Sequence, residues 1–318
     1  MLILLYTGCL GSGTEAFCRE ASAISPDLQV VPYEDAADPR LVWADAVIGG
    51  LQPEEVKRCA GLRWLQLDSA GADGFMDRSV YAREDAVLTN ASGTFGAPIA
   101  EHVLAMMLLM LRGIHLYRDQ QKRAVWERYP ERPRDFMGSA VTILGFGNLG
   151  SELAKRCHAL GAKVTAVRTR TPSEIPDYVE RVVGQEELDS AIAGCDLLVL
   201  TLPHTEKTHH ILDARRLNLM KPGAYVFNAG RGGLIDQDAL VAALQNGRIA
   251  GAGLDVMTPE PLPADSPLWH MENVLITPHV SGFSPSNRAR RSEIFLENIR
   301  RFAEGKPLRN RVDFERQY

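Results

Sequence analysis

Short apolar segments alternate with amphipathic or polar segments along most of the chain. Before residue 95, runs rich in aliphatic side chains predict five strands, at residues 2–6, 29–33, 45–49, 63–68 and 86–90. After residue 139, the same pattern predicts six more, at residues 140–145, 163–168, 196–202, 224–228, 250–256 and 273–277. Strands that alternate with helical segments form parallel sheets covered by helices, so the pattern predicts an α/β protein.

Two further apolar patterns predict helices. Residues 103–111 are apolar throughout, but a membrane span needs about 20 such residues, so this run predicts a buried helix. Near the C-terminus, apolar residues recur at helical spacing among charged ones and the pattern ends near Gly305. We expect this amphipathic helix to return to the first group of strands. Its apolar positions are Ile294, Phe295, Ile299 and Phe302.

These elements predict two Rossmann-like domains with doubly wound parallel sheets. Residues 1–95 and 285–318 are expected to form a flavodoxin-like substrate domain, and residues 96–284 a dinucleotide-binding domain, because six strands are the number that such a sheet requires. A hinge is expected near residues 90–96 and 284–286, where the chain passes between the domains.

Composition excludes several classes of protein. The 318 residues include 45% hydrophobic and 24% charged side chains, which indicates a folded chain. The net charge of -5 and the scattered lysines and arginines argue against a nucleic-acid partner. The opening "MLILLYTGCL" lacks the basic start of a signal peptide and predicts a strand, and no membrane span is expected. Five widely spaced cysteines suggest neither disulfides nor a metal site, which fits the cytoplasm.

The stretch "VTILGFGNLG" carries the strongest binding motif. Gly145, Gly147 and Gly150 form GxGxxG between a predicted strand and a predicted helix. Gly145 permits the tight turn, Gly147 lets the backbone approach a pyrophosphate, and Gly150 allows close helix packing. The helix N-terminus attracts the phosphate charge. The motif in this context predicts a dinucleotide site rather than a plain glycine turn.

The second strand of this domain ends at Arg168, where NAD-binding proteins carry an acidic residue for the ribose hydroxyl. Arg168 and Arg170, with the hydroxyls of Thr169 and Thr171, instead suit a 2'-phosphate. We therefore expect NADP(H) as the preferred cofactor and NAD(H) as the alternative. The competing interpretation is that these arginines line a solvated loop.

Three ionisable residues follow successive predicted strands: Arg231, Glu260 and His279. In an open α/β sheet, ligands bind outside the carboxyl ends of the strands, so these side chains should reach the crevice that holds the cofactor. Each of them alone has an ordinary structural explanation. Together, beside a dinucleotide motif, they predict a catalytic site.

Several stretches resemble the D-isomer-specific 2-hydroxyacid dehydrogenase family. They are "GTFGAPIAEHVLAMMLLMLR", "GFGNLG", "LPHTEKT", "FNAGRGGLID", "GLDVMTPEPLP" and "TPHVSG". The resemblance implies reversible reduction of a 2-keto acid to the D-2-hydroxy acid, with Arg231, Glu260 and His279 as the catalytic residues. The departure at Arg168 brings the chain closer to NADP-preferring glyoxylate/hydroxypyruvate reductases. The family usually forms homodimers through the cofactor domain.

The chemistry calls for these residue types independently of the resemblance. Hydride transfer to a keto carbon leaves negative charge on oxygen, which a protonated His279 can quench. Glu260 at the other ring nitrogen would fix the tautomer and stabilise the protonated ring. Arg231 offers a planar fork to the substrate carboxylate and polarises the carbonyl. Its glycine neighbours, Gly230 and Gly232 among them, would let substrate and nicotinamide approach closely.

Other residues complete the expected site. In the first domain, the backbone N–H groups of Ala70 and Gly71 are expected to receive the substrate carboxylate; the family's substrate loop lies at this place, and a plain turn is the alternative. Asp255 is expected to position the nicotinamide carboxamide, as its counterpart does in the family. The remaining expected cofactor contacts are Thr94, Asn148, Leu149, Leu202, Pro203, Thr208, Ala229, Gly230, Ser281 and Gly282.

Two alternatives are set against this prediction. A dinucleotide-sensing binding protein or corepressor would share the fold but has no use for a proton relay. Phosphoglycerate, formate and phosphite dehydrogenases are less favoured within the enzymes. The remaining histidines lack a matching partner in the sequence and are expected to be structural. They are His102, His115, His158, His209, His210 and His270. His204 lies beside the predicted cofactor groove, where its neighbours Leu202, Pro203 and Thr208 are preferred as cofactor contacts.

Overall fold

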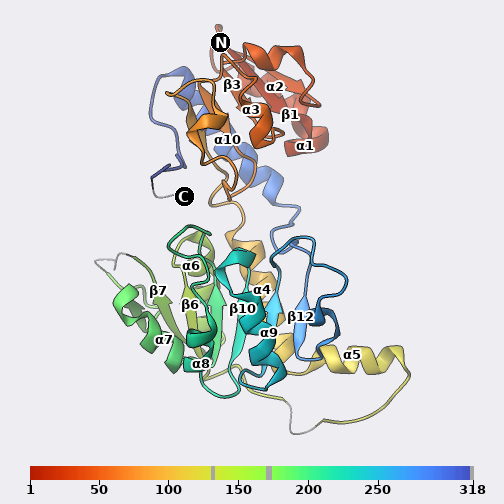
Figure 1. Cartoon of the computed structure of the whole chain (residues 1–318). Helices are drawn as coiled ribbons and strands as arrows, with labels where there is room; N and C mark the ends of the chain where they lie inside the picture. The colour runs from red at the N-terminus through yellow and green to blue at the C-terminus, as the bar shows by residue number, and fades with distance from the viewer. Residues whose placement is uncertain (130–132, 170–173, 316–318) are drawn as a thin grey trace. The chain divides into compact units, whose positions relative to one another are not determined.

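The computed structural model describes residues 1–129, 133–169 and 174–315. The chain divides into two compact units (Figure 1). Unit 1 contains Met1–Thr94 and Ser284–Tyr318, and unit 2 contains Phe95–Phe283. The chain passes between the units at residues 94–95 and 283–284. The expected domain bounds and the hinge stay predictions.

Unit 1 is built on a five-stranded parallel sheet of order β2-β1-β3-β4-β5. This is the flavodoxin-like order, and the five predicted strands are confirmed. The strands are β1 (Leu2–Tyr6), β2 (Gln29–Tyr33), β3 (Ala46–Ile48), β4 (Trp64–Gln66) and β5 (Val87–Thr89). Its helices are α1 (Thr7–Leu10), α2 (Thr14–Ser22), α3 (Pro53–Val56) and α10 (Asn287–Ala303).

Helix α10 returns from the C-terminal part of the chain to complete the core of unit 1. Phe295 and Ile299 are fully buried against residues of β1, β3 and β4. Asn298 is also fully buried, because its side chain donates to Gln66 Oε1 at 2.9 Å and accepts from the amide of Arg309 at 2.7 Å. The predicted amphipathic helix and its packing are therefore confirmed.

Unit 2 contains a seven-stranded parallel sheet of order β12-β11-β10-β9-β6-β7-β8. The strands are β6 (Ala140–Leu144), β7 (Lys163–Val167), β8 (Arg181–Val183), β9 (Leu197–Leu200), β10 (Tyr225–Asn228), β11 (Gly251–Leu254) and β12 (Val274–Ile276). The first six of them in sequence have the Rossmann order 3-2-1-4-5-6, and β12 adds a seventh. Strand β8 was absent from the prediction, which expected six strands.

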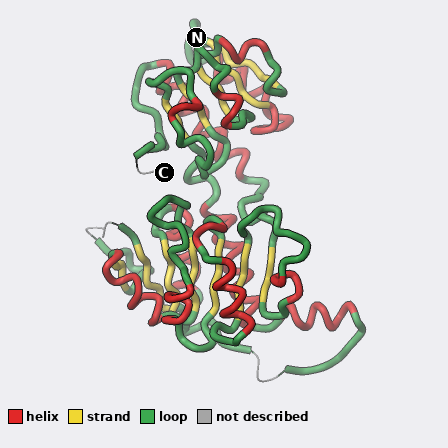
Figure 2. The backbone as a smooth tube through the Cα atoms, viewed as in Figure 1, coloured by secondary structure: helices red, strands yellow, loops and turns green. Residues whose placement is uncertain are grey.

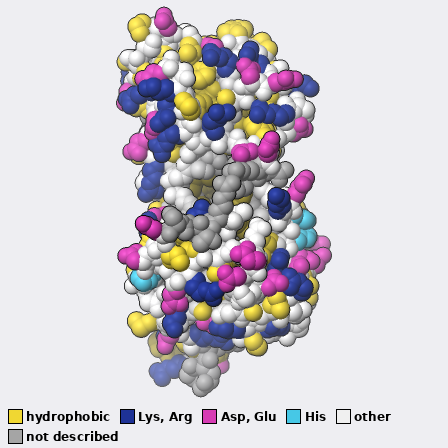
Figure 3. Space-filling model, turned by 90° about the vertical axis from the view of Figure 1, so that its left-hand side faces the viewer, with side chains coloured by type: hydrophobic (Ala, Val, Ile, Leu, Met, Phe, Trp, Pro, Cys, Tyr) yellow, Lys and Arg dark blue, Asp and Glu magenta, His cyan; other side chains and the backbone are white. Residues whose placement is uncertain are grey.

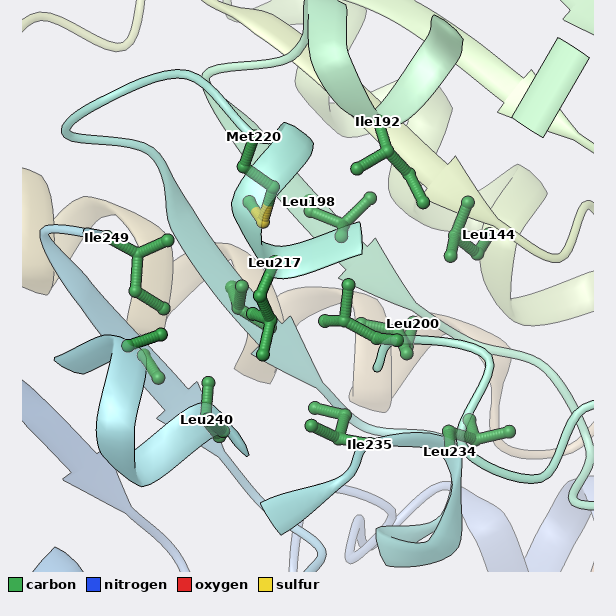
Figure 4. Close-up of a cluster of buried hydrophobic side chains, with 14 of the residues drawn as sticks. Leu144, Ile192, Leu198, Leu200, Leu217, Met220, Leu234, Ile235, Leu240 and Ile249 are labelled. Atoms are coloured by element: carbon green, nitrogen blue, oxygen red, sulfur yellow. The ribbon is translucent and has the colours of Figure 1, made fainter. Parts of the chain in front are cut away.

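Helices cover both faces of this sheet (Figure 2). The helices are α4 (Gly96–Leu111), α5 (Ile114–Lys122), α6 (Asn148–Ala159), α7 (Leu188–Gly194), α8 (Ala214–Leu219) and α9 (Gln237–Gln245). Successive strand residues point to opposite faces: Ile143 packs with α4 and α6, whereas Leu144 packs with α7, α8 and α9. Figure 4 shows the second of these cores, with Leu198 and Leu200 of β9 beside Leu217 of α8.

Short 3-10 turns connect several elements, at Gly11–Gly13, Pro39–Val42, Arg78–Val80, Gln185–Glu187, Gly232–Leu234 and Pro267–His270. Within the described residues, no single helix is long and apolar enough to cross a membrane; α4 and α5 would satisfy that test only together, and they meet at an angle of 75°. Acidic and basic side chains are mixed over the face drawn in Figure 3.

Candidate functional site

The glycine-rich turn between β6 and α6 has the geometry that a bound pyrophosphate requires. Gly145 has a φ of +103°, which favours glycine, and a Cβ at Gly150 would stand 2.0 Å from the carbonyl oxygen of Gly145. A Cβ at Gly147 would meet nothing within 4 Å, so the backbone there faces open space. Gly147 and Asn148 are exposed at the start of α6. The turn therefore presents an accessible helix N-terminus, and Leu149 packs against the core behind it.

The loops after β9 and β10 lie beside this turn. Thr201 Oγ1 donates to the carbonyl oxygen of Gly145 at 2.8 Å, which ties the end of β9 to the glycine turn. Leu202 and Pro203 follow. A Cβ at Gly230 would stand 2.7 Å from the carbonyl oxygen of Leu202, so Gly230 is needed for packing between the two loops. Ala229 before it is buried.

Thr208 has a structural task in the loop after β9. Its hydroxyl donates to the carbonyl oxygen of Pro203 at 2.7 Å and accepts from the amide of Thr205 at 2.8 Å. The side chain is largely buried. Thr208 therefore shapes the turn that was expected to contact the cofactor.

Arg168 stands directly after β7, next to the carboxyl end of β6. Its amide donates to the carbonyl oxygen of Val183 on β8, at 3.1 Å, and the side chain is partly exposed. Thr169 is exposed. Arg170 and Thr171, the other members of the expected phosphate-binding group, lie outside the described residues.

Glu260 and His279 form a hydrogen-bonded pair. His279 Nδ1 lies 2.8 Å from Glu260 Oε2, and Glu260 Oε1 accepts from the amide of Met257 at 3.0 Å. Because a carboxylate only accepts, Nδ1 carries the proton and Nε2 is left with a lone pair in the neutral ring. Nε2 has no partner among the described residues, and about half of the His279 side chain is exposed.

Asp255 holds the loop that carries His279. The amide of His279 donates to the Asp255 carbonyl oxygen at 2.8 Å. The carboxylate accepts from Thr277 Oγ1 at 2.6 Å, from the Val280 amide at 3.0 Å and from the Ser281 amide at 3.1 Å. Burial alone would raise the pKa of Asp255, but these hydrogen bonds hold that pKa below its usual value.

Asp255 has a structural task in this loop, and its expected role at the nicotinamide carboxamide stays a prediction. The residue is fully buried, and its carboxylate accepts from three donors of the loop. His279 has a φ of +52°, a left-handed conformation that costs a side-chain-bearing residue about 1–3 kcal/mol. The bonds to Asp255 stabilise the loop in that conformation. Ser281 takes part through its amide, and Gly282 follows it beside Phe95.

Arg231 belongs to a segment that packs against the Glu260 turn. It follows β10, and a Cβ at Gly232 would stand 1.9 Å from the carbonyl oxygen of Met257, whose amide donates to Glu260. Arg231 Nη1 donates to the Gly230 carbonyl oxygen at 2.7 Å. Gly230 and Gly232 thus allow close packing between loops. The sequence had instead predicted that they let substrate and nicotinamide approach closely. The three predicted residues follow β10, β11 and β12, which are neighbours in the sheet.

The expected substrate loop lies in unit 1, after β4. Asn90 Nδ2 donates to the Ala70 carbonyl oxygen at 2.8 Å, and Ser69 Oγ donates to the Gly71 carbonyl oxygen at 2.7 Å. The amides of Ala70 and Gly71 have no partner in the described part of the chain. Thr94, an expected cofactor contact, is buried in unit 1 and its hydroxyl donates to the Ala91 carbonyl oxygen.

His102 is the site residue that the sequence analysis missed. It was classed as a histidine without a partner, but its Nε2 lies 3.0 Å from Thr277 Oγ1. Sequence separation hid this contact, because His102 is on α4 and Thr277 follows β12. The AEHV pattern of the apolar helix was visible, but nothing in it indicated which loop the ring would meet.

Comparisons with known proteins agree with this geometry. The family model "D-isomer specific 2-hydroxyacid dehydrogenase, NAD binding domain" matches residues 104–281. An uncharacterized protein in the proB 3' region of Corynebacterium melassecola is 34% identical over 285 residues, 88% of this chain and 90% of that protein. Glyoxylate/hydroxypyruvate reductase B of Yersinia pestis (strain Pestoides F) is 31% identical over 269 residues, 81% of each protein.

A solved structure gives the same result over the full chain. The D-isomer specific 2-hydroxyacid dehydrogenase from Xanthobacter autotrophicus Py2, in complex with NADPH and MES, matches with a TM-score of 0.80 and 29% identity. The match covers 100% of this chain and 99% of that one. The fold and the site define a two-domain oxidoreductase with a dinucleotide-binding unit. The chain belongs to the D-isomer specific 2-hydroxyacid dehydrogenase family.

Proposed function

We propose that the protein reversibly reduces a small 2-keto acid to the D-2-hydroxy acid with NADPH, and that His279 is the proton donor. The observation that carries the proposal is the 2.8 Å contact between His279 Nδ1 and Glu260 Oε2. Both residues follow the carboxyl ends of strands in the sheet whose strand β6 leads into the glycine-rich turn. A histidine that is oriented by a carboxylate and keeps its second nitrogen exposed suits general acid catalysis. Family membership supports the class of reaction.

Each residue has a defined task in this proposal. When bound, the nicotinamide cofactor supplies the hydride that reaches the keto carbon. His279 Nε2 donates a proton to the oxygen of the substrate, and Glu260 stabilises the doubly protonated ring before transfer. Arg231 binds the substrate carboxylate and polarises the carbonyl group. In the reverse direction, His279 accepts the hydroxyl proton as a general base.

The residues present fit a dinucleotide. The exposed backbone at Gly147 and the N-terminus of α6 would hold the pyrophosphate. Arg168, which follows β7 in place of an acidic residue, favours NADP(H) over NAD(H) because a guanidinium can bind the 2'-phosphate. The structure of the Xanthobacter relative contains NADPH, which supports the same choice.

The amides of Ala70 and Gly71 are proposed as the second receptor for the substrate carboxylate. Their carbonyl oxygens are fixed by Asn90 and Ser69, so the turn is held while the two N–H groups remain available. A relative named glyoxylate/hydroxypyruvate reductase supports glyoxylate- or hydroxypyruvate-like substrates.

We also propose a homodimer in the cytoplasm. Apolar side chains are exposed on α5 and on the segment after it: Trp126 is 92% exposed, and Ile114 and Val125 are also exposed. Contact with a second copy would remove these side chains from water, which supports the dimer. Light scattering at low protein concentration tests this part, and a clean monomer would contradict it.

One experiment tests the function as a whole. Initial rates of NADPH and NADH oxidation are measured with glyoxylate, hydroxypyruvate and phenylpyruvate. We expect turnover with at least one 2-keto acid and a higher kcat/KM for NADPH. Tight dinucleotide binding without turnover of any 2-keto acid would instead indicate a sensor.

A further inference from the structure

A directed chain of hydrogen bonds connects helix α4 to the loop that carries His279. His102 Nε2 lies 3.0 Å from Thr277 Oγ1, and Thr277 Oγ1 lies 2.6 Å from Asp255 Oδ1. His102 is too far from the carboxylate for a direct hydrogen bond, at 3.9 Å. Thr277 therefore stands between the imidazole and the carboxylate.

The direction of each bond follows from the groups present. Asp255 is ionised, since the hydrogen bonds it accepts hold its pKa below the usual value, and an ionised carboxylate can only accept. Thr277 has a single hydroxyl proton, which it donates to Asp255. Its oxygen can then only accept from His102, so Nε2 of His102 carries a proton.

The hydrogen bonds to the Asp255 carboxylate hold the chain on both sides of His279. Thr277 lies two residues before it, and the amides of Val280 and Ser281, immediately after it, donate to the same Asp255 carboxylate. The amide of His279 itself donates to the Asp255 carbonyl oxygen. The orientation of the Thr277 hydroxyl therefore affects how firmly the loop is held at its first anchor.

Helix α4 is a rigid support for this contact. Val103, Met106 and Met107 are almost completely buried in the core shared with α6 and the sheet of unit 2. His102 lies on the same helix, and its side chain is 25% exposed. A donor fixed on a buried helix can constrain a loop more tightly than a donor on another loop.

We propose that His102 is a positioning residue for the reaction: by donating Nε2–H to Thr277, it directs the threonine hydroxyl onto Asp255 and holds His279 at Glu260. The inference rests on the proposed function, because it assigns His102 to the proton donor of that reaction. His102 acts through the loop and does not touch the substrate. Its loss should lower kcat and leave cofactor binding unchanged.

The test compares variants of His102 that differ in their ability to donate. His102→Leu removes the donor. His102→Gln restores an N–H group near the position of Nε2, whereas the shorter His102→Asn does not reach it. We expect kcat to fall on the order of tenfold in the Leu and Asn variants, as displacement of a catalytic group predicts. The Gln variant should stay within about twofold of the wild type, and the Kd for NADPH should change in none of them.

Thr277 provides a second, independent readout. Thr277→Val removes both bonds of the hydroxyl, so adding His102→Leu to it should lower kcat no further. Equal loss in the Gln and Leu variants, wild-type kcat in the Leu variant, or additive losses in the double variant would each overturn the inference. His158→Leu, an exposed histidine of α6, is the matched control for loss of an imidazole.

A measurement without turnover separates this inference from the proposed function. In 15N-histidine-labelled protein, the nitrogen shifts of His102 should report a proton on Nε2 in the wild type and a mixture of tautomers in Thr277→Val. A wild-type protein that reduces no 2-keto acid would refute the proposed function. An unprotonated Nε2 in the neutral ring of His102 would refute the hydrogen-bond chain whatever the activity.

Discussion

Asp255 and His279 are connected through the main chain: the amide of His279 donates to the carbonyl oxygen of Asp255 at 2.8 Å. The same aspartate uses its carboxylate to bind residues on either side of that histidine. One fully buried residue at the end of β11 therefore fixes the segment that follows β12. The placement of the His279 ring therefore depends on a side chain that is not itself accessible.

Asp255→Asn should destabilise the protein in a pH-dependent way. The amide replaces one acceptor oxygen with a donor that faces an N–H or O–H group, which should cost about 1–3 kcal/mol at pH 7. The pKa of Asp255 is lowered in the folded protein, so its contribution to stability is present above about pH 4 and is lost as pH falls through the folded pKa. The difference in free energy of unfolding between wild type and Asp255→Asn, measured by urea unfolding, should therefore be smaller below pH 4 than at pH 7. Exposed Asp265→Asn is the control, and a difference independent of pH would contradict the assignment.

His279→Gln should lower kcat on the order of 100- to 10,000-fold, the range for loss of a general acid. The Kd for NADPH should stay within about twofold, because the glycine turn is untouched. Fluorescence titration measures the Kd, and stopped-flow or steady-state assays measure kcat. Exposed His270→Gln should behave as the wild type. An unchanged kcat in His279→Gln would refute its role.

Gly150→Ala should lower the stability of the protein, whereas Gly147→Ala should lower its affinity for NADPH. A Cβ at residue 150 would stand 2.0 Å from the Gly145 carbonyl oxygen, so this variant should lose about 1–3 kcal/mol of stability. A Cβ at residue 147 meets nothing within 4 Å, so Gly147→Ala should keep its Tm and weaken NADPH binding by occupying the space of the pyrophosphate. Calorimetry and fluorescence titration distinguish the two effects. A Gly147→Ala variant with wild-type affinity would show that the dinucleotide binds elsewhere.

Arg168→Ala should raise the KM for NADPH about tenfold or more and change the KM for NADH much less. The expected loss corresponds to one charge-assisted hydrogen bond, about 1.5–3 kcal/mol. Arg181→Ala on the neighbouring strand β8 is the matched control, because that arginine is exposed and pairs with Glu187. Equal effects on both cofactors would indicate that Arg168 does not read the 2'-phosphate.

Apart from β8, the strands of the described residues could be predicted because they lie in apolar runs. Strands β3, β4, β9, β10 and β11 are buried at every position. Strand β8 was missed for a physical reason: Arg181–Val183 is only three residues long, begins with an exposed arginine and lies at the sheet edge. Its two apolar residues, Val182 and Val183, stand between Arg181 and Gly184, whereas the equally short β3 and β12 consist of three consecutive apolar residues. Its existence depends on pairing with β7, which is a tertiary contact.

The order of the strands predicted which residues of the candidate site lie close together, but not which atoms form contacts. Because parallel strands end at one edge, the proximity of Glu260 and His279 followed from their positions after β11 and β12. The hydrogen bonds of Asp255 and His102 could not be predicted, since they depend on which atoms meet once the loops have folded. No local pattern around Gly232 indicated that it lies against the Met257 carbonyl oxygen.

Unit 1 cannot complete its fold during synthesis until helix α10 has been made. Residues 1–94 emerge from the ribosome before α10, yet their sheet lacks Phe295, Ile299 and the buried Asn298–Gln66 bond until that helix has been translated. Residues 95–283 are continuous and carry all seven strands of their own sheet. Residues 95–283 can thus fold while residues 1–94 still lack α10. Residues 1–94 therefore stay incompletely folded, and exposed to aggregation and proteolysis, for a longer time.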